Sequence, residues 1–295
     1  MSDLPLLSRM DRFKSLLAAQ SATLSCPVCR GRLLPPEGSS IRCARGHCFD
    51  ISRRGYVNLA QAGTLPHYDR ALFLSRRAVL EAGFYEPLLE TLREAVRAER
   101  RRLGRPVSLL DAGCGEGYYA AALAEGEDQV FAIDLCRDAV VLAAQRPEPV
   151  CWCVADLTRL PFADRSLDVL LDVLTPASYG EFRRVLRPGG LIVKVVPGCD
   201  YLREIREAVH QPPYDNNDVV AYFHAHMDDV TNTPVRYVRK LDEGMRAPFF
   251  HMTPLTVGKK ADEAALCGIS QITLDLCVLT GRFGANAGGL QEDKR

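Results

Sequence analysis

Between residues 106 and 284, short apolar runs alternate with longer stretches in which apolar and polar residues mix. Five runs have the length of strands, and helical or turn-rich segments separate them as in βαβ units. They cover residues 107–113, 129–135, 149–156, 167–173 and 190–197. Because strands joined through helices lie parallel, this pattern predicts an α/β fold with a parallel sheet flanked by helices.

Two more apolar runs follow in the same part of the chain. They predict strands over 235–243 and 272–283, with a helix over 256–268 between them. We therefore expect residues 106–284 to form one domain. Residues 285–295 are polar and rich in glycine, which predicts a flexible tail.

The first third of the chain has three different patterns. Residues 1–22 mix charged and apolar positions and predict a short lead-in helix. Residues 23–62 are rich in Cys, Gly and Pro, which predicts a small loop-rich module. From 63 to 105 apolar residues recur at steps of three and four, which predicts a linker made of helices. The apolar positions of this linker are Leu72, Val79, Leu80, Leu88, Leu89, Leu92 and Val96.

Charge is balanced over the whole chain but unevenly distributed. Residues 1–105 hold 18 Lys and Arg against 10 Asp and Glu, a net of +8, whereas the remainder holds 19 against 27, a net of −8. The 11 cysteines follow a start without a continuous apolar segment, so we expect a reduced, cytoplasmic protein. No apolar run approaches the roughly 18 residues of a membrane helix, so we expect no membrane partner.

A glycine-rich loop, "LLDAGCGEGYY" over 109–119, follows the first predicted strand and opens a helix. Its glycines at 113, 115 and 117 allow a tight turn and a close approach by a ligand at the carboxyl edge of a parallel sheet. Asp134 ends the second strand, where its carboxylate can accept hydrogen bonds from both hydroxyls of a ribose. The two features together predict a nucleoside-containing cofactor.

Details of the loop favour S-adenosyl-L-methionine over a nicotinamide dinucleotide. Asp111 precedes the first glycine, where its carboxylate can accept from the methionine ammonium but would repel a pyrophosphate. After the third strand, Asp156 is placed to bind the adenine amino group and Leu157 to flank the ring. The alternative is structural: Asp111 caps a helix, the glycines form a turn and Asp134 is a solvated strand end.

With this loop, the acidic end of the second strand and the turn "RPGG" at 187–190, the sequence resembles class I S-adenosylmethionine-dependent methyltransferases. The resemblance implies the Rossmann-like sheet of that class. It also implies that Asp111, Gly113, Gly115 and Asp134 contact the cofactor.

Residues 24–50 concentrate possible metal ligands. Cys26, Cys29, Cys43 and His47 have the spacing Cys–x2–Cys–x13–Cys–x3–His, a set of the kind that holds structural zinc tetrahedrally. Cys48 is the rival for the fourth ligand position, and a group of buried free thiols is the alternative for the whole cluster. Four protein ligands leave no position for a water, so we expect one structural Zn²⁺ per chain.

Basic residues surround these ligands. Arginines can contact phosphates, and Tyr56 in "GYVNL" could stack on an unpaired base, which predicts RNA recognition. The alternative is a solvated basic face with Tyr56 packed inward. The arginines are Arg30, Arg32, Arg42, Arg45, Arg53 and Arg54.

The order of these features is similar to that of the RlmA family of 23S rRNA (guanine-N1)-methyltransferases, over nearly the whole chain. The segments 174–190 and 194–205 most resemble the branch found in Gram-positive bacteria. The resemblance implies methyl transfer to N1 of a guanine in a hairpin loop of 23S rRNA, a zinc-binding, ribbon-like module before the methyltransferase domain, and cofactor contacts by further residues. These are Tyr85, Tyr119, Ala120 and Tyr201. It is also compatible with a homodimer.

Guanine N1 carries a proton at neutral pH, so its methylation calls for a general base or for stabilisation of the developing charge on O6. Asp172, at the end of the fourth strand, and His251 in "FFHMTPL" are candidates for this role. Neither is supported by a motif, because Asp172 can equally be a carboxylate at a strand end and His251 a packed histidine. The sequence therefore leaves the catalytic residue unassigned.

Two other functions remain open at this stage. A small-molecule methyltransferase would explain the glycine loop but not the cysteine cluster. A zinc-dependent rRNA-binding protein without turnover would explain the cysteine cluster but not Asp111, the glycines and Asp134.

Overall fold

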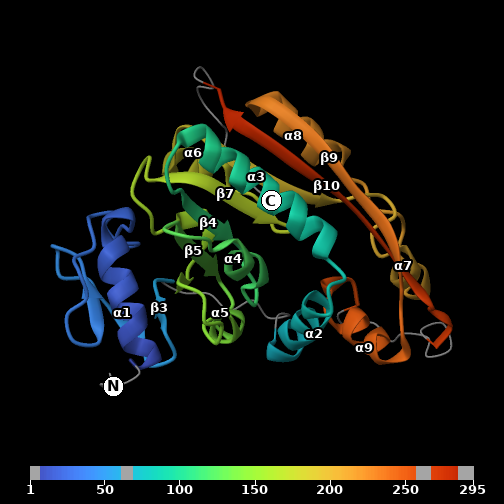
Figure 1. Ribbon diagram of the computed structural model, residues 1–295, viewed down its shortest axis with the longest axis horizontal. Coiled ribbons are helices and arrows are strands. Elements are labelled where there is room, and N and C mark those ends of the chain that lie inside the picture. Colours follow the sequence, from blue (N-terminus) through green and yellow to red (C-terminus); the bar gives the residue numbers. More distant parts are fainter. Residues whose placement is uncertain (1–6, 61–68, 257–266, 285–295) are drawn as a thin grey trace.

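The computed structural model describes residues 7–60, 69–256 and 267–284. Its strands form one ten-stranded sheet in the order β1-β2-β3-β6-β5-β4-β7-β8-β10-β9 (Figure 1). The strands are β1 Ser40–Arg42, β2 Cys48–Ser52, β3 Tyr56–Asn58, β4 Ser108–Ala112, β5 Gln129–Asp134, β6 Val150–Val154, β7 Leu167–Val173, β8 Leu186–Pro197, β9 Met227–Lys240 and β10 Gln271–Phe283.

Helices cover the sheet and connect its strands. The α-helices are α1 Arg9–Gln20, α2 Arg70–Glu81, α3 Glu86–Leu103, α4 Tyr118–Leu123, α5 Arg137–Ala143, α6 Tyr179–Val185, α7 Arg203–Ala208, α8 Asn217–His226 and α9 Glu243–His251. Three 3₁₀ turns lie at Ser21–Thr23, Leu157–Arg159 and Pro254–Thr256. In the described part of the chain, no helix is both long enough and apolar enough for a membrane span.

The central strands are parallel and buried on both faces. β6, β5, β4, β7 and β8 pair in parallel, and every residue of β4 and β6 is buried. Such strands read as continuous apolar runs because helices cover both sides. The five strands predicted from these runs are confirmed, and β8 begins earlier than expected, at Leu186.

The carboxyl-terminal part of the sheet differs more from the prediction. β9 and β10 form a long antiparallel pair, and β10 is antiparallel to β8. β9 spans Met227–Lys240 rather than 235–243, because Glu243 already begins helix α9. Helices α7 and α8 precede β9 and were not predicted. Most of the helix predicted over 256–268, and the predicted tail at 285–295, lie outside the described residues.

The amino-terminal segment is joined to the main sheet. β3 pairs in parallel with β6, through Val57 opposite Cys153 and Asn58 opposite Val154. Leu24 also forms a β-bridge with Phe162, and α1 packs near β6. The cysteine-rich segment and α1 therefore lie at one edge of a continuous sheet, as Figure 1 shows in blue.

The predicted linker of helices is confirmed as α2 and α3. Helix α2 packs against two helices from later parts of the chain, α5 and α9 (Figure 1). Leu72 and Phe73 of α2 form an apolar cluster with Ala139 and Leu142 of α5. This packing fixes α2 beside the segment that follows β5.

Candidate cofactor and metal sites

The glycine loop leaves the sheet at the carboxyl end of β4, and the neighbouring strand β5 ends at the same edge. Gly113, Gly115 and Gly117 have φ values of +81°, +56° and +85°, which residues with a Cβ rarely adopt. A Cβ on Gly117 would lie 2.6 Å from the Trp152 ring. The loop thus needs glycine both for its backbone conformation and for its packing on β6.

Asp134 holds the loop in this conformation. Its carboxylate accepts hydrogen bonds from the backbone N–H of Gly115 at 2.9 Å and of Cys136 at 2.7 Å. Burial raises the pKa of Asp134, while these two N–H groups act in the opposite direction. Asp134 is therefore a half-buried carboxylate bonded to the glycine loop, rather than a freely solvated strand end.

Asp111 is buried beneath the same loop. One of its oxygens, Oδ2, has no hydrogen-bond partner among the described residues, while the carboxylate also interacts with the backbone N–H of Ala120 in α4. Burial raises its pKa to about 7, and the negative charges of Asp134 and Asp172 act in the same direction. A buried carboxylate oxygen without a donor is costly, and an ammonium group is the kind of partner that would satisfy it. Asp111 therefore fits the aminoacyl end of S-adenosylmethionine.

The structure brings three of the predicted tyrosines together. The hydroxyls of Tyr85, just before α3, and Tyr201, just after β8, are hydrogen-bonded at 2.7 Å. Tyr119 of α4 is buried nearby, and burial raises the pKa of all three phenols, that of Tyr201 to about 12. Ala120 is buried beside Tyr119. Neutral phenols and a small side chain thus border the loop.

Asp156 and Leu157 follow β6 at the same edge, and both are half-buried. The Oδ1 atom of Asp156 accepts from the backbone N–H of Thr158 at 2.8 Å and from its hydroxyl at 2.7 Å. Asp156 therefore caps a 3₁₀ turn with Oδ1, and its Oδ2 atom accepts no hydrogen bond from the residues that the structure describes.

The structure supports neither candidate for the general base. Asp172 is fully buried and its Oδ2 atom forms an ion pair with Lys194 Nζ at 2.6 Å, across the paired strands β7 and β8. Its Oδ1 atom has no hydrogen-bond partner within the described segments. His251 is exposed at the end of α9, so it is not the packed histidine of the alternative. The catalytic residue stays unassigned.

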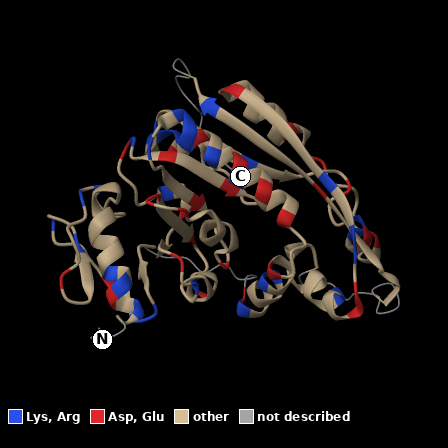
Figure 2. Cartoon of the chain, in the orientation of Figure 1, with Lys and Arg blue, Asp and Glu red and all other residues tan. Residues whose placement is uncertain are grey.

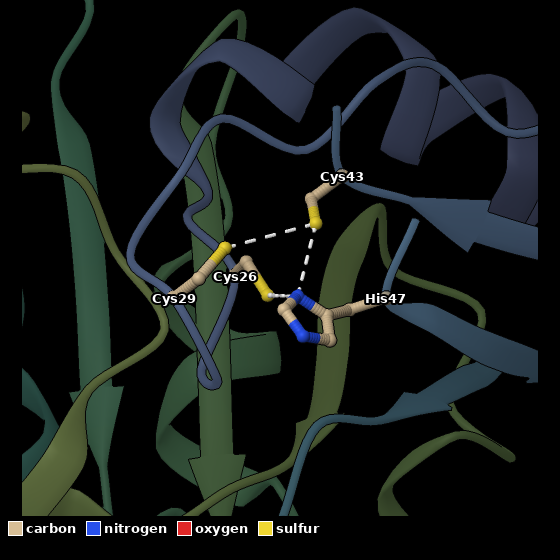
Figure 3. A group of neighbouring side chains, drawn as sticks. All are labelled: Cys26, Cys29, Cys43 and His47. Atoms are coloured by element: carbon tan, nitrogen blue, oxygen red, sulfur yellow. Dashed lines mark hydrogen bonds between the residues drawn. The ribbon is translucent and has the colours of Figure 1, made fainter. Parts of the chain in front are cut away.

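The four predicted metal ligands converge (Figure 3). Their Sγ and Nδ1 atoms all lie within 4.8 Å of one another. His47 Nδ1 is 3.6 Å from Cys26 Sγ and 3.3 Å from Cys43 Sγ, and the sulfurs of Cys29 and Cys43 are 3.8 Å apart. Tetrahedral zinc, with Zn–S of about 2.3 Å and Zn–N of about 2.0 Å, places its ligand atoms about 3.5–3.8 Å apart. The cluster fits a zinc ion.

Local structure explains this convergence. Cys26 and Cys29 lie on one turn, in which the Arg30 N–H donates to the Cys26 carbonyl at 2.8 Å. Cys43 and His47 flank the tight turn between β1 and β2, in which Gly46 has a φ of +86°. Cys48 is exposed and is not part of the cluster, so it is not a rival ligand. Burial raises the pKa of Cys43, but hydrogen bonds from the N–H groups of Arg45 and His47 lower it by more, so that the net pKa is about 6. This low pKa favours the thiolate form, which is the form that metals bind.

Tyr56 is not available for stacking on a base. Its side chain is buried and its hydroxyl accepts a hydrogen bond from Arg137 Nε at 3.0 Å. The inward-packed alternative for Tyr56 is therefore confirmed. The arginines around the metal cluster are exposed, and only Arg30 has a carboxylate partner, Glu181, among the described residues.

Sequence reasoning missed a buried charge cluster behind the glycine loop. Glu116, in the middle of the loop motif, is buried and accepts from Arg77 Nε of α2 at 2.8 Å. Arg146, after α5, bonds both the carboxylate and the backbone carbonyl of Glu116. The only sequence signal for this buried cluster was a charged residue, Glu116, among the glycines of the loop. In the same way, Lys194 within the apolar run "GLIVKVVP" was the signal for the buried pair with Asp172.

Comparison with known families gives two matches along the chain. A model described as "RlmA, N-terminal" matches residues 24–62, and one described as "Methyltransferase domain" matches residues 109–190. The first contains the metal cluster and the second contains the glycine loop.

Several curated proteins are similar over most of the chain. A putative 23S rRNA (guanine-N(1)-)-methyltransferase, YxjB of Bacillus subtilis, is 34% identical over 87% of this chain and 95% of its own length. The 23S rRNA (guanine(748)-N(1))-methyltransferase of Streptomyces fradiae is 31% identical over 86% of this chain and 94% of its own. A malonyl-[acyl-carrier protein] O-methyltransferase of a Methylovorus strain is 31% identical, but over only 52% of this chain and 59% of its own.

Solved structures are more distant. The YcgJ protein from Bacillus subtilis has 17% sequence identity and a TM-score of 0.42, and the alignment covers 60% of this chain and 92% of that protein.

Proposed function

The chain belongs to the RlmA family of 23S rRNA (guanine-N1)-methyltransferases, and from this we propose that it transfers a methyl group from S-adenosylmethionine to N1 of a guanine in a hairpin loop of 23S rRNA. One observation carries the proposal. A Cys3His cluster surrounded by exposed arginines lies at the edge of the same sheet whose centre carries the cofactor loop. A single body can therefore hold RNA and cofactor in a fixed relation.

The arginine surface supports an RNA substrate. We define it as Arg32, Arg42, Arg45, Arg53 and Arg54, which are all exposed and have no carboxylate within salt-bridge distance among the described residues. Unpaired arginines are free to contact phosphates, which supply much of the affinity for nucleic acids. Figure 2 shows basic residues distributed over this end of the molecule. Since Tyr56 is buried, we assign base stacking to no residue of this surface.

The chemistry of the acceptor explains a hairpin loop. Guanine N1 lies on the Watson–Crick edge, so the base must be unpaired and turned out of its stack, and a loop lowers that cost of a few kcal/mol. When bound, S-adenosylmethionine supplies an electrophilic methyl group on a sulfonium. Asp111 would hold its ammonium, Asp134 its ribose hydroxyls and Asp156 with Leu157 its adenine. The tyrosines 85, 119 and 201, with Ala120 and the glycines, would exclude water around it.

We also propose the remaining assignments. Cys26, Cys29, Cys43 and His47 hold one structural zinc ion, which folds the turns that carry the arginine surface. The module that reads RNA comprises residues 23–62, and the methyltransferase domain residues 106–284. We place the enzyme in the cytoplasm, where rRNA is made and where thiols stay reduced, and we expect it to act as a homodimer.

The other functions explain less of the structure. A small-molecule methyltransferase leaves the metal cluster and the arginine surface without a purpose, and the similarity to the malonyl-carrier enzyme covers only about half of the chain. An RNA-binding protein without turnover leaves the orphaned oxygen of Asp111 and the fixed loop without a ligand.

Nucleoside analysis of 23S rRNA tests the proposal. Mass spectrometry of rRNA from cells with and without the gene should show the loss of one N1-methylguanosine, and the purified enzyme with S-adenosylmethionine should restore it. Unchanged rRNA nucleosides would refute the substrate, even if the protein binds the cofactor.

A further inference from the structure

Helix α2 carries two consecutive arginines with different surroundings. Arg77 is fully engaged: it binds the Glu116 carboxylate at 2.8 Å and the Leu142 carbonyl at 2.8 Å. Arg76 makes one hydrogen bond among the described residues, from Nη2 to the Met252 carbonyl at 3.1 Å, and lies 5.4 Å above the Phe73 ring. A guanidinium has five N–H donors, so most donors of Arg76 are uncommitted.

Arg76 lies at the cofactor loop. Its Nη1 atom is 3.4 Å from the position that a Cβ on Gly115 would occupy. Its charge also affects two groups of the proposed cofactor site. Burial raises the pKa of Asp134 and of Tyr201, and the positive charge of Arg76 acts in the opposite direction on both. A residue of the linker helix thus lies against the glycine loop, close enough for its charge to act on both Asp134 and Tyr201.

The position of Arg76 matters because the cofactor carries a negative charge as well as positive ones. S-adenosylmethionine carries an ammonium, a sulfonium and one α-carboxylate. Asp111 and Asp134 are suited to its positive and hydroxyl groups, but both would repel the carboxylate. A desolvated carboxylate needs a cation or several hydrogen-bond donors.

The other cations near the loop are already paired. Arg77 and Arg146 both bind Glu116, and Lys194 binds Asp172. Arg76 has no carboxylate within salt-bridge distance among the residues that the structure describes. Its planar guanidinium can bind a carboxylate through two parallel hydrogen bonds, which a lysine cannot do.

We propose that Arg76 binds the α-carboxylate of the methyl donor, so that helix α2 contributes one side of the cofactor site. This inference rests on the proposed use of S-adenosylmethionine but not on the RNA substrate. The hydrogen bond from Arg76 to Met252 then links the bound cofactor to the end of α9.

Two cofactor analogues distinguish this role from a structural one. S-adenosylhomocysteine contains the carboxylate, whereas 5′-methylthioadenosine keeps the adenosine and sulfur but lacks the amino-acid group. Binding of each to the full-length, zinc-loaded protein is measured by calorimetry. We expect Arg76→Gln to weaken S-adenosylhomocysteine by about 10–100-fold, the range for a charge-assisted hydrogen bond, and methylthioadenosine by less than about twofold.

Two further variants complete the experiment. Arg76→Lys keeps the charge but not the paired donors, and should give an intermediate loss for S-adenosylhomocysteine. Arg70→Gln removes an exposed arginine from the first turn of the same helix and should leave both affinities unchanged. If Arg76→Gln does not fold, the lysine variant alone decides, because its loss must still be confined to S-adenosylhomocysteine.

The outcomes are distinct. Equal losses for both ligands, or no loss for either, would refute the role of Arg76. A wild-type protein that binds neither ligand would instead refute the proposed function. Selective loss of the ligand that carries the carboxylate would support the inference.

Discussion

The metal-binding turns and the parallel strands are stabilised in different ways. In β4 and β6 every side chain is buried, whereas β2 buries only one of its five. The strands are held by apolar packing, which contributes about 25 cal/mol per Å² of buried apolar surface. The turns at 24–50 have too few apolar residues for that, so four ligands on one ion take the place of a core.

The two regions also share apolar packing. Phe13, Leu17 and Leu24 are buried in the same apolar cluster as the central strands. β3 is an additional strand of the main sheet. We therefore expect α1 and β3 to depend on the sheet, and only the turns between them to depend on zinc.

Removal of zinc should separate the two regions and have the largest effect. With all four ligands, the apparent free energy of zinc binding at such sites is about 10–16 kcal/mol. Cys26→Ser leaves only three ligands, so we expect the loss of about one equivalent of zinc. Methylation of rRNA should fall at least about 100-fold, while S-adenosylhomocysteine affinity changes less than about twofold.

The measurements are metal analysis, calorimetry and rRNA methylation. Cys48→Ser is the matched control, because Cys48 is exposed and outside the cluster, and it should retain its zinc. Unfolding of the whole sheet on zinc loss would contradict the separation of the two regions.

Glu116 tests whether the sheet domain depends on apolar packing alone. The buried carboxylate is bound by Arg77 and Arg146. In Glu116→Gln, the two arginines lose their buried counter-charge and keep only the exposed Glu81 as a carboxylate partner. We expect the free energy of unfolding to fall by about 3 kcal/mol. Urea denaturation measures this change. Glu94→Gln removes an exposed pair with Arg101 and should cost less than about 0.5 kcal/mol. Equal effects of the two substitutions would show that the cluster contributes no special stability.

Gly117 tests how tightly the loop is packed onto β6. In Gly117→Ala the new Cβ would lie 2.6 Å from Trp152, at a φ of +85°. We expect a loss of about 2 kcal/mol, since strain and overpacking add. Gly126→Ala has the same backbone problem, at a φ of +60°, but no atom lies within 4 Å of its Cβ, so about 1 kcal/mol is expected. Thermal unfolding of the pair measures the packing contribution as the difference. Equal losses would mean that Trp152 moves aside.

The two regions also differ in how much of them the sequence predicts. Central strands were predictable because burial on both faces leaves continuous apolar runs, and the four metal ligands because their spacing reflects two tight turns. The join between β3 and β6 was not, because three residues carry no signal of a partner strand more than 90 positions away. The contact between Tyr85 and Tyr201 and the ion pairs of Glu116 with two arginines likewise arise from tertiary packing, which no local sequence pattern encodes.

The smallest expected effect concerns protonation of Asp111. Its pKa is raised to about 7, first by burial and then by Asp134, Asp172 and Glu116, against about 3.9 in an unfolded chain. Because the folded-state pKa is raised, ionisation of Asp111 lowers stability as pH rises from about 4 to about 7. The ammonium group of a bound cofactor favours the ionised form of Asp111, so with cofactor bound the ionisation no longer lowers stability.

Between pH 6 and pH 8, the ionised fraction of Asp111 should rise from about one tenth to about nine tenths, so S-adenosylhomocysteine affinity should increase up to about tenfold. Calorimetry over this pH range measures the increase, and two controls isolate Asp111. Asp111→Asn should bind weakly with little dependence on pH, and 5′-methylthioadenosine, which lacks the ammonium, should show no increase with the wild-type protein. A pH-independent affinity for S-adenosylhomocysteine would mean that the ammonium binds elsewhere, and that the orphaned oxygen in the core of the sheet is a structural cost without a ligand.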